Sequence, residues 1–371
     1  MTETLGIVLA SHRFWPSTGG SERTVQNLAR ALAARGHRVT VVTSREPGSA
    51  AVERFDPGFT VLRLPTHDLG RFRWVREYLP TLRRLEGTGS VDVFHLNGNR
   101  VWCAEWYLAF QRRFRWPVVL NAHGFWQLGM RDWWFDRWYF RRYFAGRLAR
   151  WPVYLCYTSQ EAAQVRGWGY TGRTIVLPPV LDRSEFPPRT GPRDPRLALV
   201  TGGNYPNKRV AELLEAVAGS GWHFEVTGPR LPDPRLDSIA RHEGDAVRIL
   251  GIVPRATLLE RYAAASAYLS MARWEGYGVA LQEALAAGTP FVATPTGGAP
   301  DFAARGAGFL AEDRTGFLDG LGRLEAPSTW AACSRAGVEA SREADPDAVL
   351  PRYEQAYREA IDRRLSSGPA A

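Results

Sequence analysis

The chain has 371 residues, of which 47 are basic and 38 acidic, giving a formal net charge of +9. Hydrophobic residues make up 45% and charged residues 23%, which excludes a disordered chain, and the length indicates two domains rather than one. No apolar run reaches the roughly 18 residues that a membrane-spanning helix needs.

Cysteine usage and the N-terminus bear on the compartment. Three scattered cysteines, Cys103, Cys156 and Cys333, give neither a disulfide framework nor zinc-ligand spacing and favour a reducing compartment. The apolar run 5–10 has no basic region before it and is too short for a signal peptide, so we expect a cytoplasmic protein. Lys208 is the single lysine among the basic residues, and the positive charge favours anionic partners such as nucleotides, phospholipid surfaces or nucleic acid.

The chain begins with the pattern of a parallel sheet. Residues 5–10 are typical of a buried strand, and the loop that follows ends in Gly19-Gly20. Ser21 is a suitable helix N-cap, and apolar residues continue at helical spacing before the next strand at 39–43. The order strand, helix, strand predicts a parallel sheet, while the absence of GxGxxG disfavours a dinucleotide-dependent oxidoreductase.

Further strands are predicted from short runs rich in β-branched residues at 61–64, 91–95, 118–121 and 153–158. His123 comes just after the third of these. Open α/β sheets bind ligands outside the carboxyl ends of their strands, so His123 is either a ligand-binding residue or a structural histidine.

The composition changes between residues 100 and 151. Eight of the fourteen tryptophans lie here, with ten arginines and only three acidic residues. The aromatic residues point in all directions around a helix, so they do not form a single core stripe. Ordinary core, an aromatic acceptor pocket and a surface that contacts a membrane all remain open, and stacking on nucleic acid is the weakest alternative.

The second half begins after a proline-rich linker at 178–195. A strand at 197–201 leads into Gly202-Gly203-Asn204-Tyr205-Pro206-Asn207-Lys208-Arg209 and then a helix through residue 217. This is close to a P-loop, but Asn207 stands where the glycine before the lysine should be, and Arg209 where Ser or Thr is required, which excludes an ATPase of that type. Strands at 223–227 and 247–250 follow.

Two glutamates bracket a glycine-containing turn between the strand 267–271 and a helix. Glu275 precedes Gly276-Tyr277-Gly278, and Glu283 lies more than a helical turn inside the helix. Glycine lets the backbone approach a ligand, and the free N–H groups of a helix start attract an anion such as a phosphate. Because seven residues separate the two acids, we expect them to bind different parts of one extended ligand.

Taken together, these segments resemble the retaining glycosyltransferases of family 4 (glycosyl transferases group 1), which have the GT-B fold. The resemblance rests on Gly19-Gly20-Ser21-Glu22, on His123, on Lys208, on the Glu275–Glu283 spacing and on Gly297-Gly298-Ala299-Pro300-Asp301. It implies an α/β protein with two Rossmann-like domains that face a central cleft. Residues 1–180, with a C-terminal helix of about 350–371 crossing back, would bind the acceptor, and residues 181–349 would bind the nucleotide-sugar.

The resemblance also implies roles for individual residues. Glu283 would bind the ribose and Glu275 the hydroxyls of the sugar, while Lys208 would bind the diphosphate and His123 would lie near the reacting centre. The catalytic set is therefore His123, Glu275 and Lys208. The other implied donor-binding residues are Gly19, Gly20, Arg209, Ile252, Val253, Gly276, Tyr277, Gly278, Val279 and Ala280. The family's second phosphate-binding residue, an arginine, falls on Gly202 or Gly203, and Arg209, Arg230 or Arg273 could replace it.

The family implies transfer of a hexose from a UDP- or GDP-linked donor to an acceptor hydroxyl, without a metal or other cofactor. The expected acceptor is a lipid-linked sugar or a hydrophobic natural product. Residues 100–151 would make a weak contact with an anionic membrane on its inner face, and nucleic acid is not an expected partner. A nucleotide-sugar epimerase on the same fold and a non-catalytic nucleotide-sugar-binding module are the alternatives.

Overall fold

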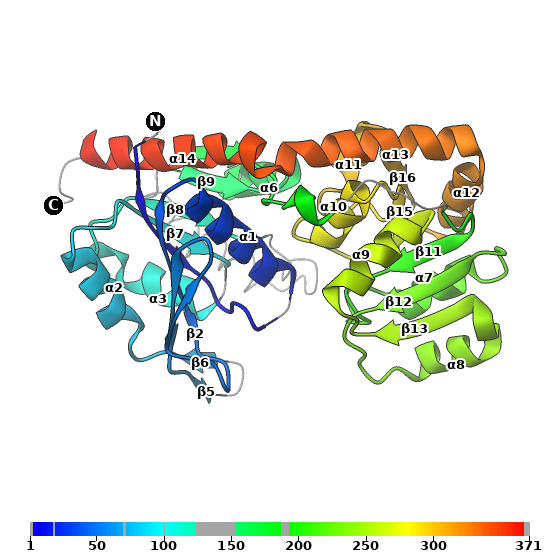
Figure 1. The fold of residues 1–371 in the computed structure, drawn as a ribbon, viewed down its shortest axis with the longest axis horizontal. Helices are drawn as coiled ribbons and strands as arrows, with labels where there is room; N and C mark the ends of the chain where they lie inside the picture. Colours follow the sequence, from blue (N-terminus) through cyan, green and yellow to red (C-terminus); the bar gives the residue numbers. More distant parts are fainter. Residues whose placement is uncertain are drawn as a thin grey trace. The chain divides into compact units, whose positions relative to one another are not determined.

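The computed structural model describes residues 3–17, 19–69, 72–99, 101–123, 138, 153–186 and 193–366. The chain forms two compact units, one made of Met1–Val180 with Pro346–Ala371 and the other of Leu181–Asp345. Each unit is a mostly parallel sheet with helices on its two faces (Figure 1). The structure thus confirms the prediction of two Rossmann-like α/β units.

The first unit is built on a sheet of eight strands in the order β10-β9-β8-β7-β1-β2-β4-β3. All neighbours are parallel except β3 and β4. The strands are β1 (Gly6–Ala10), β2 (Arg38–Ser44), β3 (Val52–Phe55), β4 (Phe59–Leu64), β7 (Val93–Asn97), β8 (Val118–Asn121), β9 (Val153–Cys156) and β10 (Arg173–Val176). A separate antiparallel hairpin pairs β5 (His67–Leu69) with β6 (Phe72–Trp74).

Side chains alternate between the two faces of this sheet, and each face has its own core. Val8 and Ala10 of β1 belong to a core with α2 (Tyr78–Gly87), α3 (Trp102–Phe110) and α6 (Ser159–Gly167). Ile7 and Leu9 belong to a second core with α1 (Gly20–Ala34) and α14 (Pro346–Ser366). Strands that are covered on both faces need apolar residues at every position, which explains their continuous apolar runs.

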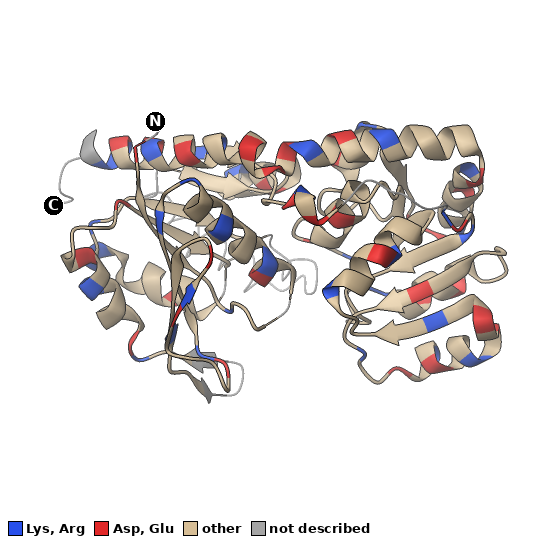
Figure 2. Cartoon of the chain, in the orientation of Figure 1, with Lys and Arg blue, Asp and Glu red and all other residues tan. Residues whose placement is uncertain are grey.

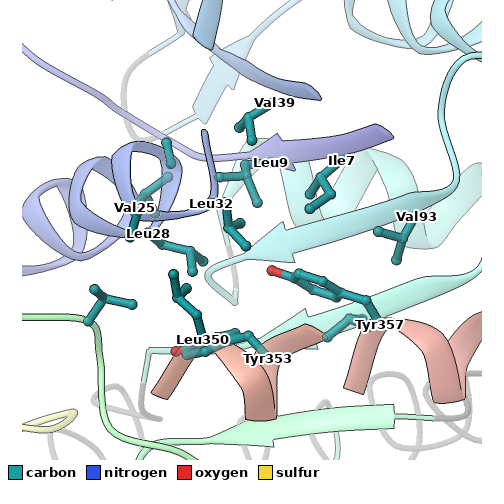
Figure 3. Close-up of a cluster of buried hydrophobic side chains, with 14 of the residues drawn as sticks. Ile7, Leu9, Val25, Leu28, Leu32, Val39, Val93, Leu350, Tyr353 and Tyr357 are labelled. Atoms are coloured by element: carbon teal, nitrogen blue, oxygen red, sulfur yellow. The ribbon is translucent and has the colours of Figure 1, made fainter. Parts of the chain in front are cut away.

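The C-terminal helix α14 is an integral part of the first unit, as predicted. Its Leu350, Tyr353 and Tyr357 side chains point toward α1 and the strands β1 and β7 (Figure 3). The hydroxyl of Tyr357 lies 2.8 Å from Nδ1 of the buried His95, and Glu354 forms a 2.7 Å ion pair with Arg35. Apolar packing and these polar contacts together fix α14 on the sheet.

The second unit has a sheet of six parallel strands in the order β13-β12-β11-β14-β15-β16. The strands are β11 (Leu197–Val200), β12 (His223–Thr227), β13 (Val247–Gly251), β14 (Ala267–Ser270), β15 (Phe291–Ala293) and β16 (Gly308–Leu310). The helices are α7 (Val210–Val217), α8 (Pro234–Glu243), α9 (Arg255–Ala264), α10 (Val279–Ala286), α11 (Ala299–Ala304), α12 (Arg314–Glu325) and α13 (Pro327–Ser341).

Short 3-10 turns complete the described structure: η1 (Gln111–Arg113), η4 (Arg183–Glu185), η5 (Gly244–Ala246) and η6 (Arg342–Ala344). Charged side chains of both signs are interspersed along the elements of each unit (Figure 2). Many of them form ion pairs, such as Arg235 with Glu215 and Arg305 with Glu343.

Candidate active site

In each sheet the strand order reverses at one point, and open α/β sheets bind ligands outside the carboxyl ends of their strands at such a point. The reversal lies between β1 and β7 in the first unit and between β11 and β14 in the second. Gly19 and Gly20 follow β1, Lys208 follows β11, and Glu275 follows β14. These sequence-predicted residues thus follow strands that flank the reversal point of their own unit.

In the loop after β11, the side chain of Lys208 lies close to the backbone of Gly202. Gly202 has φ of +96°, and a Cβ atom at this position would lie 3.3 Å from Cε of Lys208. Gly203 has φ of +73°, and a Cβ atom there would collide with the carbonyl oxygen of Pro229. The loop can therefore hold no side chain at Gly203, which gives a structural reason why an arginine is absent from that one of its two implied positions.

Lys208 and Glu275 form an ion pair at the reversal point of the second sheet. The ammonium group donates to Oε1 of Glu275, and the two side chains are 20% and 18% exposed. Burial lowers the pKa of Lys208, but the Glu275 carboxylate and the Tyr268 hydroxyl outweigh burial, so the pKa lies above its ordinary value. Lys208 is therefore charged at neutral pH and can neutralise an anionic ligand.

The two loops that carry this pair are also joined through their backbones. The N–H of Arg273 donates to the carbonyl oxygen of Asn207 at 2.8 Å. On the other side, Gly297 has φ of +57°, and a Cβ atom there would lie 2.9 Å from Cβ of Glu275. The Gly297-Gly298 segment therefore serves here as a close packing surface for the Glu275 loop.

Helix α10 begins directly after this loop with its first N–H groups uncapped by a side chain. Gly278 precedes the helix in the left-handed conformation, with φ of +90°. Val279 and Ala280 are the first helical residues, so their N–H groups have no acceptor within the helix. The Tyr277 ring packs edge-on against the Phe302 ring, with 5.9 Å between the ring centroids. Its side chain therefore has a structural role, and only its backbone belongs to the turn before α10.

Glu283 is buried within α10 and paired with an arginine that sequence reasoning missed. Nη1 of Arg255 lies 2.9 Å from Oε1 of Glu283, whose side chain is 5% exposed. Burial lowers the pKa of Arg255, but Glu283 and Glu185 outweigh burial and raise it. Arg255 comes two residues after Val253, and this closeness to a predicted donor-binding residue is the only sequence signal that could have indicated it.

Ile252 and Val253 follow β13 at the carboxyl edge of the same sheet. The Ile252 side chain is 74% exposed, which is unusual for a large aliphatic residue, and Val253 is half-buried. An exposed apolar residue at this edge could pack against the flat face of a base.

Three arginines could replace the missing phosphate-binding arginine, and they differ in their partners. Arg209 pairs with Glu212 and Arg230 pairs with Asp237. Arg273 is exposed and forms no ion pair with any residue that the structure describes. It also lies next to Lys208 through its bond to Asn207.

In the first unit, helix α1 starts at Gly20 rather than at Ser21. Gly19 is the N-cap residue and makes no side-chain cap, while Ser21 lies inside the first turn and donates to Glu22 at 2.8 Å. The expectation that Ser21 caps the helix is therefore wrong, because the helix uses the extended backbone of Gly19 instead. This leaves the first N–H groups of α1 beside Gly19 and Gly20 without a side-chain acceptor in a cap.

His123 is held by three polar residues at the carboxyl ends of β7, β8 and β9. Its N–H donates to Oδ1 of Asn121 at 3.0 Å, which supports its left-handed φ of +57°. Ring Nε2 lies 3.1 Å from Oδ1 of Asn97, and Nδ1 lies 3.4 Å from the Tyr157 hydroxyl.

The bonding of Asn97 decides the tautomer of His123. Nδ2 of Asn97 donates to the carbonyl oxygen of His95 at 3.3 Å, so Oδ1 is the atom that faces the His123 ring. Nε2 of His123 therefore carries the proton, and Nδ1 accepts from Tyr157. Burial lowers the pKa of His123 to about 4, so the ring is neutral at pH 7. Sequence reasoning missed Asn97, Asn121 and Tyr157, which each lie at or just after the end of a strand.

The aromatic region predicted at 100–151 is described only in part. Within α3, Trp102 and Tyr107 are buried and belong to the core. Trp106 packs edge-on against the half-exposed Trp74 at 4.6 Å and stacks on Phe110 at 5.7 Å. Residues 124–137 and 139–152, which include Arg137, Arg141 and Arg142, lie outside the described residues.

Metal ligands and membrane-spanning helices are two further features that bear on function. No group of three or more His, Cys, Asp or Glu side chains in the described ranges is placed to hold a metal ion. None of the helices in those ranges has the length and apolar character needed to cross a bilayer.

Comparison with known proteins identifies the family. The model of Glycosyltransferase Family 4 matches residues 18–185, and the model of Glycosyl transferases group 1 matches residues 195–326. The chain is a family 4 glycosyltransferase. As a member of this family, it is an enzyme that transfers a sugar from a nucleotide-sugar donor.

Several relatives of this glycosyltransferase have named activities. It is 24% identical to a phosphatidylinositol N-acetylglucosaminyltransferase subunit from Arabidopsis thaliana, over 80% of this chain and 69% of that protein. The human protein of the same name is 22% identical, with 81% and 64% covered, so the chain spans less than two thirds of its length. GDP-mannose:cellobiosyl-diphosphopolyprenol alpha-mannosyltransferase of Komagataeibacter xylinus is 25% identical, with 98% and 95% covered.

Solved structures confirm that the glycosyltransferase has the GT-B fold. Sucrose-phosphate synthase from Thermosynechococcus elongatus aligns with a TM-score of 0.81 at 20% identity, covering 97% of this chain and 100% of that one. HepE from Anabaena, in complex with UDP and glucose, aligns with a TM-score of 0.70 at 17% identity, covering 95% and 98%. At these identities the likeness concerns the fold alone.

Proposed function

We propose that this glycosyltransferase moves a hexose from a UDP- or GDP-linked donor to an acceptor hydroxyl with retention of configuration. The observation that carries the proposal is the meeting of Lys208, Glu275 and the uncapped start of α10 at the reversal point of the second sheet. A cation, a carboxylate and free N–H groups in one place suit a diphosphate that is joined to a polyhydroxylated sugar.

We assign the donor to the second unit, residue by residue. Lys208 and the N–H groups of Val279 and Ala280 bind the diphosphate, and Glu275 accepts hydrogen bonds from the sugar hydroxyls. Glu283 binds the ribose hydroxyls, and the exposed Ile252 packs against the base. Gly276 and Gly278 let the backbone of the turn approach the phosphates.

We infer that Arg273 provides the second positive charge that the family places in the loop after β11. It is the one of the three candidate arginines that has no carboxylate partner among the described residues. Its backbone bond to Asn207 places it beside the loop that carries Lys208.

The chemistry of the proposal is stabilisation of a leaving group. As the bond between sugar and phosphate breaks, negative charge grows on the diphosphate, and preorganised donors lower the barrier most effectively where charge develops. Lys208 and α10 supply these donors, so the proposed step requires no metal. His123 is neutral at pH 7, and we assign it a contact with the sugar rather than proton transfer.

We assign binding of the acceptor to the first unit. We also assign to Gly19, Gly20 and His123, which belong to this unit, contacts with the donor. The named relatives act on phosphatidylinositol and on a diphosphopolyprenol, and both are lipids. We therefore propose a lipid-linked sugar as the acceptor, with a hydrophobic natural product as the second candidate. A weak contact with the inner face of an anionic membrane, through residues 100–151, would bring the enzyme to such an acceptor.

Calorimetry with UDP, GDP and their sugars tests the donor assignment. A charged hydrogen bond contributes about 1.5–3 kcal/mol, so Lys208→Ala should weaken nucleoside diphosphate binding by roughly 10- to 150-fold and abolish most transfer. Binding of the free nucleoside should not change, because it has no phosphate. Equal nucleoside diphosphate affinity in wild type and variant would refute the role of Lys208.

The products distinguish transfer from the two alternatives. A transferase forms a glycosylated acceptor whose anomeric configuration, read by NMR, matches that of the donor. An epimerase changes the sugar of the donor without any acceptor, and a binding module leaves the donor intact. Family membership favours transfer.

A further inference from the structure

In the proposed donor site, Lys208 and Glu275 form an ion pair in which their opposite charges neutralise each other. Lys208 is the only cation that pairs with Glu275 among the described residues, and Glu275 is its only carboxylate partner there. Each side chain keeps about a fifth of its surface exposed, so a ligand can reach both. Lys208 therefore meets an incoming anion as a paired cation, not as a free one.

The backbone beneath the pair restricts where the two side chains can go. Gly202 lies directly under the Lys208 side chain and Gly297 directly against Cβ of Glu275, with hypothetical Cβ distances of 3.3 Å and 2.9 Å. The bond from Arg273 to Asn207 joins the two loops at 2.8 Å. The two loops thus hold the bases of both side chains close together, so that phosphate and carboxylate compete for the same ammonium group.

A nucleoside diphosphate and an intact nucleotide-sugar both compete with Glu275 for Lys208, but the free-energy cost of separating the ion pair differs between them. When phosphate oxygens bind Lys208, the carboxylate of Glu275 loses its cation and lies beside a second negative charge, which is unfavourable. An intact donor offsets this loss, because its sugar hydroxyls can donate hydrogen bonds to Glu275. The free diphosphate has no sugar and leaves Glu275 without a partner.

We propose that Glu275 discriminates the intact nucleotide-sugar from the free nucleoside diphosphate, by competing with phosphate for Lys208 whenever no sugar is bound. This inference rests on the proposed donor site. It gives Glu275 a second role after transfer: once the sugar has left, Glu275 pairs with Lys208 again and promotes release of the diphosphate product. The raised pKa of Lys208 agrees with a strong pairing in the ligand-free site.

The test compares Glu275→Gln with wild type by calorimetry, using UDP, GDP, UDP-glucose and GDP-mannose. Removing the competing charge should strengthen binding of the free nucleoside diphosphate by about fivefold or more, a typical coupling between two binding groups. The ratio of intact-donor to free-diphosphate affinity should fall by at least the same factor. Product inhibition of transfer should become stronger in parallel.

Two further variants show whether the effect passes through Lys208. In a Lys208→Gln background, Glu275→Gln should strengthen diphosphate binding clearly less than it does in the wild type, because there is no cation to release and only the repulsion between carboxylate and phosphate is removed. Glu215→Gln is the matched control, since it removes the acid of an exposed ion pair with Arg235 in the same unit and should leave all affinities unchanged. Glu275→Met also releases Lys208 and is measured beside Glu275→Gln, so that a folding defect in one variant does not decide the result.

The outcomes separate this inference from the proposed function. If wild type binds a nucleoside diphosphate and neither Glu275→Gln nor Glu275→Met binds it more tightly, the inference is wrong and the donor site stands. If wild type binds none of the four compounds, the proposed donor site fails and the inference fails with it.

Discussion

Arg255 and Glu283 form a buried ion pair, with Nη1 of the guanidinium 2.9 Å from Oε1 of the carboxylate. The same guanidinium donates to Glu185 from Nε at 3.0 Å and from Nη2 at 2.7 Å. One arginine thus fixes the carboxylate that we assign to the ribose and joins it to η4. The position of Glu283 depends on a residue outside α10.

Replacing Arg255 with methionine should destabilise the enzyme and weaken nucleotide binding. The Glu283 carboxylate would lose its ion pair with Arg255 while it remains buried, and breaking a buried pair in this way costs about 3 kcal/mol. Urea unfolding measures the stability and calorimetry the affinity for UDP and GDP. Arg235→Met is the matched control, because Arg235 is 57% exposed in its pair with Glu215, and such surface pairs contribute less than about 1 kcal/mol. Equal losses of stability in the two variants would show that the buried pair with Glu283 contributes no more than a surface pair.

Placing an arginine at position 203, one of the two positions implied for the family's arginine, should fail. Gly203 has φ of +73°, which costs other residues about 1–2 kcal/mol, and its Cβ would also collide with the carbonyl oxygen of Pro229. Gly203→Arg should therefore lower the melting temperature without raising affinity for a nucleoside diphosphate. Gly219→Arg is the control, since Gly219 also has φ of +73° but has open space around its Cβ position. A tighter-binding and equally stable Gly203→Arg protein would contradict this explanation of the missing arginine.

The fold could be predicted from the sequence because its strands are covered on both faces. Runs such as 118–121 are apolar at nearly every position, and the structure places β8 there. Helix starts were less predictable: the sequence favoured Ser21 as an N-cap, whereas the extended backbone at Gly19 takes that place. Local side-chain preference is a weak guide where glycine allows several backbone conformations.

The donor residues could be predicted only where they stand in a motif. Lys208, Glu275 and Glu283 were indicated by spacing and composition, but their pairing was not. Arg255 lies 28 positions before Glu283, and their contact arises only when α9 packs beside α10. Asn97 lies 26 positions before His123, and their contact requires the pairing of β7 with β8. The direct pairing of Lys208 with Glu275 is equally a product of the adjacency of β11 and β14.

Acid should destabilise the first unit through the buried His95, which bonds to Tyr357 of α14 at 2.8 Å. Burial lowers the pKa of His95 to about 3 from an ordinary value of 6.5, so the unfolded chain takes up a proton at higher pH than the folded one. The stability from neutral His95 is therefore complete above about pH 6.5 and decreases as the pH falls toward 3. Each pKa unit corresponds to about 1.4 kcal/mol, so the loss approaches several kcal/mol.

Thermal unfolding between pH 7 and pH 4.5 measures this effect. His95→Gln keeps a polar group near Tyr357 but cannot titrate, so its melting temperature should depend less on pH than that of the wild type. His223→Gln, at an exposed histidine of the second unit, is the control and should follow the wild type. Parallel curves for wild type and His95→Gln would mean that other groups cause the acid sensitivity.

Binding to anionic vesicles tests the proposed membrane contact of residues 100–151. In the described part of this region and beside it, Trp74, Trp106 and Phe110 pack in series, and the Arg113 guanidinium lies 4.8 Å from the Phe110 ring. Tryptophan beside arginine suits the interface of an anionic bilayer. The protein should therefore pellet with phosphatidylglycerol liposomes at low salt and remain in solution at high salt.

Changing Arg137, Arg141 and Arg142 to serine should reduce pelleting without lowering donor affinity. Each basic residue near an anionic surface contributes about 1 kcal/mol, so the three together change the partition coefficient by roughly 100-fold. The matched control replaces Arg230, Arg235 and Arg248, which are more than half exposed in the second unit, with the same loss of charge. If both triple variants lose pelleting equally, binding reflects total charge and not this region. If the wild type stays in the supernatant at low salt, the enzyme does not use a membrane contact, and a soluble acceptor in an aromatic pocket becomes the better hypothesis.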